Sequence, residues 1–342
     1  MDYLFEEDAA LKAFVLVSLA ICAGLAQDQP GNAQNLNAPA GNGQKAAKNQ
    51  APKKWPQKYT HAPDLADVPY GPHQRNKFDL WRAKSGKPTP LAIYYHPGGF
   101  SLGDKSSIPT AFLEACLEKG ISVATVNYRY SFQAHYPAPF QDSARALQFL
   151  RLHAKEYNVD PKRVTAQGAS AGGGISMWLG FKPDMADPKS DDPVQRQSTR
   201  LPVIAAVDGQ CTYDPRLIAK LIDEDTGRLI SRMALWQLFG FDKNEDPFKA
   251  EKFFPAFEDS SAINFIKAGA PPAFLYYHAP LEPLPVKIQA DAVHNIRHGL
   301  AVKERMDKLG IECVVRDSSQ YQGATRAEQL NRDMVTFFLK YL

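Results

Sequence analysis

The chain has 342 residues, of which 44% are hydrophobic and 23% charged, a composition typical of a globular protein with a full core. A formal net charge of +3 does not indicate a nucleic-acid partner, because such proteins cluster lysine and arginine densely on one face. One large domain is expected.

The first segment with a clear pattern is the apolar run Ala13–Ala26, which follows Lys12 and contains small residues at its end. Its length of about 14 residues is below the roughly 20 that a membrane-spanning helix needs. We therefore expect a signal peptide over residues 1–26, an exported (periplasmic or extracellular) protein and no stable membrane anchor. The acidic start MDYLFEED departs from the usual positively charged n-region.

Residues 27–56 are rich in Gln, Asn, Ala, Gly, Pro and Lys, and they lack the apolar periodicity of a packed element. This composition predicts a disordered linker that leads into a domain over residues 57–342.

Within that domain, short apolar segments alternate with amphipathic ones. After an early strand region at Tyr70–Trp81, the strands are expected at Pro90–His96, Ile121–Tyr128, Arg163–Gly168, Leu201–Asp208, Pro272–His278 and Ile311–Arg316. The helices are expected at Ile108–Lys119, Phe140–Glu156, Ala171–Leu179, Gly299–Leu309 and Arg326–Leu342. This alternation predicts an α/β fold with a mostly parallel sheet covered by helices on both faces.

Residues 213–262 fit no strand-helix unit. They are expected to form either a cap-like insertion over a site or helices that simply pack on the domain. The cysteines Cys116, Cys211 and Cys313 have no metal-ligand spacing, so we expect three buried thiols, no disulfide framework, no bound metal and no cofactor.

The motif GASAG, Gly168–Gly172, lies where a predicted strand turns into a predicted helix. A serine on such a sharp turn needs small neighbours, and its hydroxyl is exposed at the carboxyl edge of the sheet. Ser170 is therefore the candidate nucleophile. A second motif, HPGGF, follows the strand Pro90–His96, and its paired glycines allow backbone N–H groups to approach a substrate oxyanion.

These two motifs, with YRY (Tyr128–Tyr130) and PPAFLYY (Pro271–Tyr277), resemble those of α/β-hydrolases of the hormone-sensitive-lipase-like and carbohydrate-esterase-like groups. The resemblance covers roughly Val68 to the C-terminus and implies an α/β-hydrolase fold.

The usual first motif of those groups is His-Gly-Gly-Gly, whereas this chain has Pro97 at the first glycine. Proline has no N–H to donate. The oxyanion-hole donors that the resemblance implies fall on Gly98, Gly99 and Ala171.

The resemblance puts the acid of the catalytic triad in the loop Ala279–Pro285, where Glu282 is the residue that fits. Asp208 and Asp291 are alternatives.

The histidine of the triad normally comes from the loop after the last strand. That loop here is Ser318–Ala324, it contains no histidine, and a predicted capping box at Thr325–Glu328 starts the last helix at once. His294 or His298 could instead fold back over Ser170, and His96 is expected to support the oxyanion loop.

Two functions follow from these residues. The first is a serine ester hydrolase that acts on small-molecule acyl esters or on carbohydrate-linked esters. The second is a protein of the same fold that binds an ester or carbohydrate ligand without efficient turnover, because the usual histidine is absent.

Overall fold

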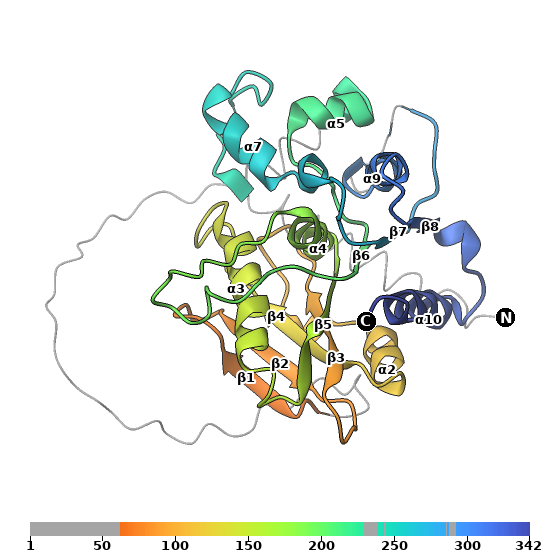
Figure 1. Ribbon diagram of the computed structural model, residues 1–342. Helices are drawn as coiled ribbons and strands as arrows, with labels where there is room; N and C mark the ends of the chain where they lie inside the picture. The colour runs from red at the N-terminus through yellow and green to blue at the C-terminus, as the bar shows by residue number, and fades with distance from the viewer. Residues whose placement is uncertain (1–61, 229–237, 243, 285, 287–291) are drawn as a thin grey trace, which may run out of the picture. The chain divides into compact units, whose positions relative to one another are not determined.

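Eight strands form one sheet in the computed structural model, which describes residues 62–228, 238–242, 244–284, 286 and 292–342 (Figure 1). The predicted signal peptide and linker lie outside the described residues. The strand order is β1-β2-β4-β3-β5-β6-β7-β8, and all neighbours pair in parallel except β1 with β2 and β2 with β4. The bounds are β1 Leu65–Pro69, β2 Lys77–Trp81, β3 Thr89–Tyr95, β4 Ser122–Asn127, β5 Val159–Ala169, β6 Ile204–Val207, β7 Ala273–Tyr277 and β8 Cys313–Asp317.

Successive side chains of the central strand β3 point to opposite faces of the sheet, and both faces are buried. Leu91, Ile93 and Tyr95 join one hydrophobic core, whereas Ala92 and Tyr94 join another. The sheet therefore separates two hydrophobic cores, and this explains why the side chains on both faces of β3 are buried.

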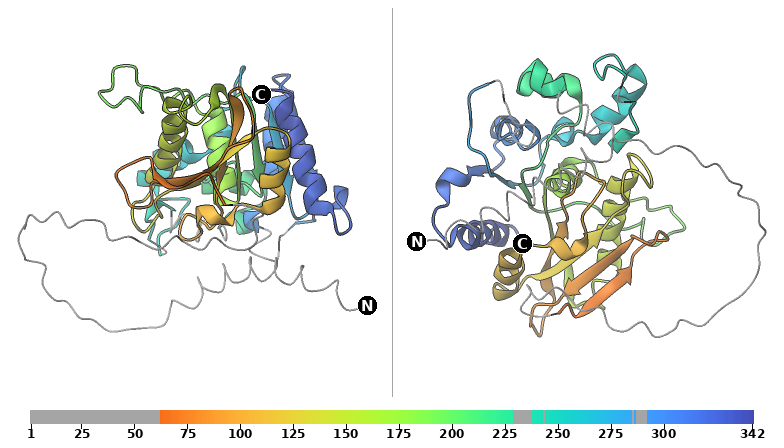
Figure 2. Two further views of the ribbon diagram at one scale, coloured as in Figure 1. Left: turned by 90° about the horizontal axis from the view of Figure 1, so that it is seen from below. Right: turned by 180° about the vertical axis from the view of Figure 1, so that it is seen from behind.

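Helices α3, α4 and α9 contribute to the first core, and helices α2 and α10 contribute to the second. Figure 2 shows α2 and α10 side by side, in agreement with their contacts. The helix bounds are α2 Thr110–Glu118, α3 Ala138–Leu152, α4 Ala171–Phe181, α5 Pro215–Leu221, α7 Phe254–Ser260, α9 Arg297–Asp307 and α10 Arg326–Leu339; the short 3₁₀ helices are η1 Lys105–Ser107, η2 Glu251–Phe253, η3 Ala262–Phe265 and η4 Ser318–Gln320.

The predicted α/β fold is confirmed, but the predicted capping box at the start of α10 is wrong. Thr325 makes no side-chain bond to the helix backbone, and its φ of −96° and ψ of 11° differ from the extended conformation that capping favours. Its hydroxyl instead accepts a hydrogen bond of 2.9 Å from the Gln329 side chain. A capping box forms instead eight residues earlier, between Asp317 and Gln320 at η4.

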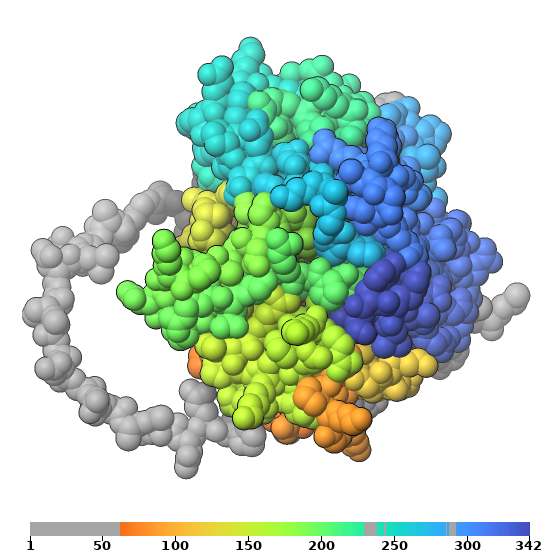
Figure 3. Space-filling view, viewed as in Figure 1, coloured from red at the N-terminus to blue at the C-terminus, as the bar shows by residue number. Residues whose placement is uncertain are grey.

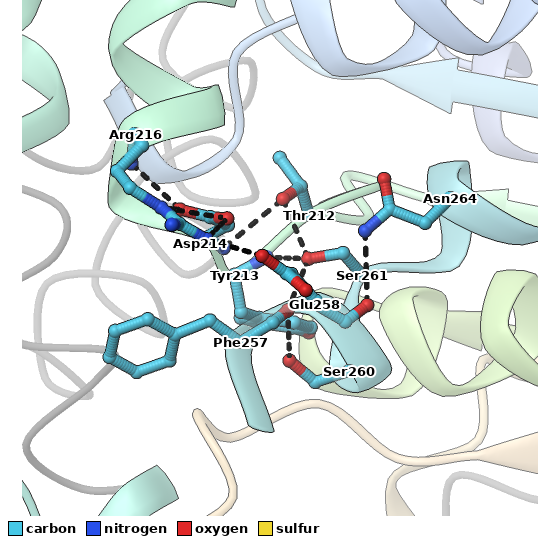
Figure 4. Close-up of polar contacts among 9 residues, drawn as sticks. All are labelled: Thr212, Tyr213, Asp214, Arg216, Phe257, Glu258, Ser260, Ser261 and Asn264. Carbon is cyan, nitrogen blue, oxygen red and sulfur yellow. Dashed lines mark hydrogen bonds and ion pairs between the residues drawn. The ribbon is translucent and has the colours of Figure 1, made fainter. Parts of the chain in front are cut away.

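The described parts of the predicted insertion, residues 213–262, form α5, η2 and α7 and lead into η3. Asp214 caps α5 and pairs with Arg216, which also forms an ion pair of 2.8 Å with Glu258 on α7 (Figure 4). Below them, the Ser261 hydroxyl donates to the Phe257 carbonyl oxygen at 2.6 Å.

Contacts join η3 to α4 and α5 to α9, and the space-filling view shows the green-to-cyan surface of the insertion next to the blue surface of α9 (Figure 3). The insertion therefore packs on the helices of the first core. A covering role over the site stays a prediction, because residues 229–237 lie outside the described part of the chain.

Cys116, Cys211 and Cys313 are buried free thiols, as predicted. In the part of the chain that the structure describes, no three His, Cys, Asp or Glu side chains are grouped so that they could hold a metal ion. Over the same residues, no helix combines the length and the apolar character needed to cross a membrane.

Candidate active site

The GASAG motif forms the turn between β5 and α4. Ser170 has φ +50° and ψ −114°, a conformation that is costly for any residue other than glycine. A Cβ atom on Gly172 would lie 1.9 Å from the main-chain oxygen of Tyr95, and one on Gly168 would lie 2.3 Å from that of Gly172. The glycines therefore let the start of α4 lie directly against the end of β3, which holds Ser170 in its strained conformation.

The strand register brings the candidate site residues to one edge of the sheet. Gly168 pairs with Tyr95 of β3, and Ala169 pairs with Val207 of β6, which in turn pairs with Tyr276 of β7. The residues that follow these positions emerge at the carboxyl ends of adjacent parallel strands. From β3 the chain passes to β4 on one side, and from β4 it returns to β5 on the other side of β3. Open α/β sheets bind ligands at such a reversal of strand order.

The loop after β3 carries Gly98 and Gly99, two of the predicted oxyanion-hole donors, in a tightly constrained backbone. Gly98 and Gly99 have φ values of +125° and +55°, and a Cβ atom on Gly98 would lie 2.1 Å from the Leu102 main-chain oxygen. The Gly98 carbonyl accepts hydrogen bonds of 3.0 Å from the N–H groups of Ser101 and Leu102. Among the described residues, none accepts a hydrogen bond from the N–H groups of Gly98, Gly99 or Ala171, which leaves these donors available for a substrate oxygen.

His96 is fully buried beneath this loop and supports it, as predicted. Its ring stacks on Tyr128 with centroids 4.2 Å apart, and its Nδ1 lies 2.7 Å from the Pro97 carbonyl oxygen. Burial lowers the pKa of His96 to about 4, so the ring is neutral at pH 7. Nδ1 then carries the proton, and Nε2 accepts from Arg75 at 3.3 Å.

A buried ion pair closes the other end of the loop. The Lys105 ammonium lies 2.6 Å from the Asp79 carboxylate, and both side chains are almost completely buried. Burial raises the pKa of Asp79, while the charge of Lys105 opposes that rise. The Lys105 N–H donates to the Asn127 side chain at 2.6 Å, and Asn127 donates to Asp104 at 2.7 Å. These bonds anchor the loop to strands β2 and β4.

His294 lies next to the candidate nucleophile: its Nε2 is 2.9 Å from the Ser170 Oγ. This distance is within the reach that proton transfer between the two groups requires. His294 lies in the connection between β7 and α9. In this fold the histidine usually comes from the loop after β8, which is the next connection along the chain.

The second candidate histidine, His298, belongs to the core. Its side chain is fully buried, its Nδ1 faces the Cys211 sulfur at 3.5 Å, and its Nε2 has no hydrogen-bond partner among the described residues. Burial, together with the nearby His294, lowers the pKa of His298 to about 4. The ring is therefore neutral at pH 7, and no contact between it and Ser170 is present in the described structure.

The three candidate acids are placed differently. The Glu282 side chain is exposed, and Glu282 contacts Arg297 through its main-chain carbonyl oxygen, at 2.9 Å. Asp291 lies outside the described residues. Asp208 follows β6 at the edge that carries Ser170, and only 8% of its surface is exposed.

Asp208 is paired with a histidine that the sequence analysis treated only as the last residue of a strand. The His278 N–H donates to Asp208 Oδ1 at 2.8 Å, and the His278 Nδ1 bonds to Oδ2. Burial raises the pKa of Asp208, but the imidazoles of His278 and His294 outweigh burial and hold that pKa below its usual value. The sequence contained one signal for this pair, because His278 stands directly before the loop that was predicted to hold the acid.

Residues 78–284, more than half of the chain, match the model of the BD-FAE family. LipM of Mycobacterium tuberculosis, named as a carboxylic ester hydrolase, is 28% identical over 294 residues, which are 84% of this chain and 64% of LipM. The carboxylesterase NlhH of the same organism is 30% identical over 187 residues, 54% of each chain. The matches thus span less than two-thirds of these curated relatives.

Solved structures show the same fold. A carbohydrate esterase from gut microbiota aligns with a TM-score of 0.63 at 17% identity, over 84% of this chain and 99% of that one. An acetyl ester-xyloside bifunctional hydrolase from Caldicellulosiruptor lactoaceticus aligns with a TM-score of 0.59 at 22% identity, over 80% and 95%. With the family match and the strained serine turn, these findings lead to one conclusion: the chain belongs to the BD-FAE family and has the α/β-hydrolase fold.

Proposed function

We propose that this protein is a carboxylic ester hydrolase that uses Ser170 as its nucleophile and His294 as its general base. The observation that carries the proposal is the contact of 2.9 Å between the Ser170 hydroxyl and the His294 Nε2, at a serine with the strained backbone of a nucleophile turn. The similarity to LipM and NlhH, both named as ester hydrolases, supports the same activity.

In the first step, the Ser170 oxygen attacks the ester carbonyl carbon while its proton passes to the His294 Nε2. The carbonyl electron pair moves onto the oxygen, and the resulting oxyanion accepts hydrogen bonds from the N–H groups of Gly98, Gly99 and Ala171. The positive end of helix α4, which begins at Ala171, favours the same negative charge.

In the second step, the tetrahedral intermediate collapses, the bond to the alcohol oxygen breaks, and the alcohol leaves with the proton that His294 carried. A water molecule then gives a proton to His294 and attacks the acyl group on Ser170. Collapse of this second intermediate releases the acid and returns the proton to Ser170. No cofactor enters these steps.

We propose that the substrates are small acyl esters, including esters linked to carbohydrate. The names of two structural neighbours, an acetyl ester-xyloside hydrolase and a carbohydrate esterase, support the carbohydrate link. An exported enzyme would meet such substrates outside the cytoplasm, although export itself rests on residues 1–26, outside the described part of the chain.

The alternative of a binding protein without turnover depended on the absence of a histidine. The contact between His294 and Ser170 supports His294 as that histidine, so we favour catalysis over the alternative.

Labelling of the purified protein with a fluorophosphonate probe tests the proposal, together with hydrolysis of p-nitrophenyl acetate. Ser170→Ala should abolish labelling, and His294→Gln should lower turnover about 10⁴- to 10⁶-fold, as expected for loss of a triad member. Ser319→Ala, an exposed serine in the loop after β8, is the matched control and should label normally. Labelling and turnover that survive in Ser170→Ala would contradict the proposal.

A further inference from the structure

We infer that Asp208 is the carboxylate that stabilises the charged form of His294, and that His278 is a positioning residue that holds this carboxylate in place. The inference rests on the proposed function, since it concerns the group that assists the base of that reaction. It departs from the position that the family resemblance predicts, the loop after β7, because the carboxylate comes from the end of β6 and a histidine begins that loop.

The strand register places Asp208 beside the nucleophile. Ala169 pairs with Val207, so Ser170 and Asp208 are the next residues on adjacent parallel strands. The Ser170 N–H donates to the Val207 carbonyl at 2.8 Å, which links the serine turn to the residue just before Asp208. The two side chains therefore emerge at neighbouring positions on one edge of the sheet.

The carboxylate of Asp208 is held by two hydrogen bonds from one residue. The His278 main-chain N–H engages Oδ1 and the His278 ring engages Oδ2, so both oxygens of the buried carboxylate have a donor. Asp208 itself has a φ of +50°, and its N–H donates to the Tyr276 carbonyl at 2.7 Å. A positive φ at a buried aspartate is a strained conformation, of the kind found at functional sites.

Two imidazoles act on the Asp208 carboxylate, those of His278 and His294, and both favour its ionised form. His278 in turn faces the Asp208 carboxylate, the Tyr276 ring and the charge of Arg326 at the start of α10. The centroids of the His278 and Tyr276 rings are 5.1 Å apart, and the two rings are nearly perpendicular. Burial lowers the pKa of His278, but Asp208 outweighs both burial and Arg326 and raises that pKa overall. Asp208 is thus charged at neutral pH. Its place beside Ser170, whose hydroxyl contacts His294 at 2.9 Å, puts this negative charge at the edge of the sheet where His294 takes up the proton.

This arrangement has a consequence for the pH dependence of catalysis. His294 must be neutral to accept the Ser170 proton, so the reaction stops where His294 is already protonated. Protonation of His278 places a positive charge beside Asp208 and weakens the effect of its negative charge on His294. On the acid side of the pH profile, activity should therefore depend on the protonation of two groups. It should fall with decreasing pH more steeply than the protonation of a single group allows.

The first test measures kcat and KM for p-nitrophenyl acetate in carboxylate variants. Asp208→Asn should lower kcat about 10⁴-fold, the effect of removing the acid from a related triad, with KM little changed. Glu282→Gln and Asp291→Asn are tested in parallel. A loss of this size in either of them, with Asp208→Asn near wild type, would overturn the inference. Glu156→Gln, which breaks an exposed pair with His153 at the end of α3, is the matched control.

The second test uses His278, and it does not depend on whether Asp208→Asn folds. Asparagine presents a side-chain N–H close to where the histidine Nδ1 lies, but it does not titrate. His278→Asn should keep kcat within about tenfold and reduce the acid limb to one ionisation, whereas His278→Ala should lower kcat about 10- to 100-fold through loss of a hydrogen bond to a charge. An acid limb in His278→Asn identical to that of the wild type would overturn the inference.

The two proposals can fail separately. Turnover that depends on Ser170 and His294 but survives in Asp208→Asn would remove the role of Asp208 and leave the serine mechanism standing. Turnover that survives in Ser170→Ala would remove the mechanism itself.

Discussion

The buried histidine His298 should make the protein sensitive to mild acid. Burial, with a contribution from His294, lowers its pKa from 6.5 to about 4, whereas the unfolded chain takes up the proton near pH 6.5. Between these values the unfolded state binds more protons than the folded state, so stability is lost as pH falls from 6.5 towards 4. The difference of about 2.5 pKa units corresponds to about 3 kcal/mol below pH 4, and to about 2 kcal/mol at pH 5.

The variant His298→Leu isolates this contribution. Leucine fills a similar volume and carries no proton, and the His298 Nε2 has no hydrogen-bond partner among the described residues to lose. His96, the other histidine whose pKa burial lowers to about 4, contributes equally to both proteins and cancels in the comparison.

Urea unfolding followed by tryptophan fluorescence at pH 7.5 and pH 5 gives the free energy of unfolding for each protein. The wild type should lose about 2 kcal/mol more than His298→Leu between the two pH values. Equal losses in the two proteins would show that His298 is protonated in the folded state, and would refute the reasoning.

Three substitutions test other parts of the site. Gly172→Ala puts a Cβ 1.9 Å from a main-chain oxygen of β3, so it should lower the melting temperature and abolish fluorophosphonate labelling, whereas Gly86→Ala, with open space around it, should do neither. Lys105→Met removes the ammonium that pairs with the buried Asp79 carboxylate and leaves that carboxylate only the Asp67 N–H, which should cost about 3–5 kcal/mol in urea unfolding; failure of a second change, Asp79→Leu, to restore stability would contradict this account. Ser170→Gly relieves a strained φ of +50°, so it should be more stable than Ser170→Ala by about 1 kcal/mol or more; a less stable glycine variant would argue against strain.

Several features of the site could be predicted because their signals are local. The strand before His96 and the strand before Ser170 are short apolar runs, and each is followed within a few residues by glycines that only a tight turn requires. The fold class follows from the same alternation, since apolar strands with amphipathic helices between them can bury their side chains only in a covered parallel sheet.

Local signals also misled at one point. The residues at Thr325–Glu328 have the types of a capping box, but the turn that precedes α10 gives Thr325 a conformation in which its hydroxyl bonds to a side chain instead. Cap formation depends on the path of the chain into the helix, which residue types alone do not specify.

The sheet, the serine turn and the glycine loop could be predicted from local residue patterns, because each depends on neighbours within one or two elements. The partners of Ser170 and Asp208 become visible only when distant parts of the chain are brought together in the fold. His294 is 124 residues from Ser170, and His278 is 70 residues from Asp208. Their meeting depends on the register of β5, β6 and β7 and on the path of the chain between β7 and α9, and no local pattern of residues encodes either of these.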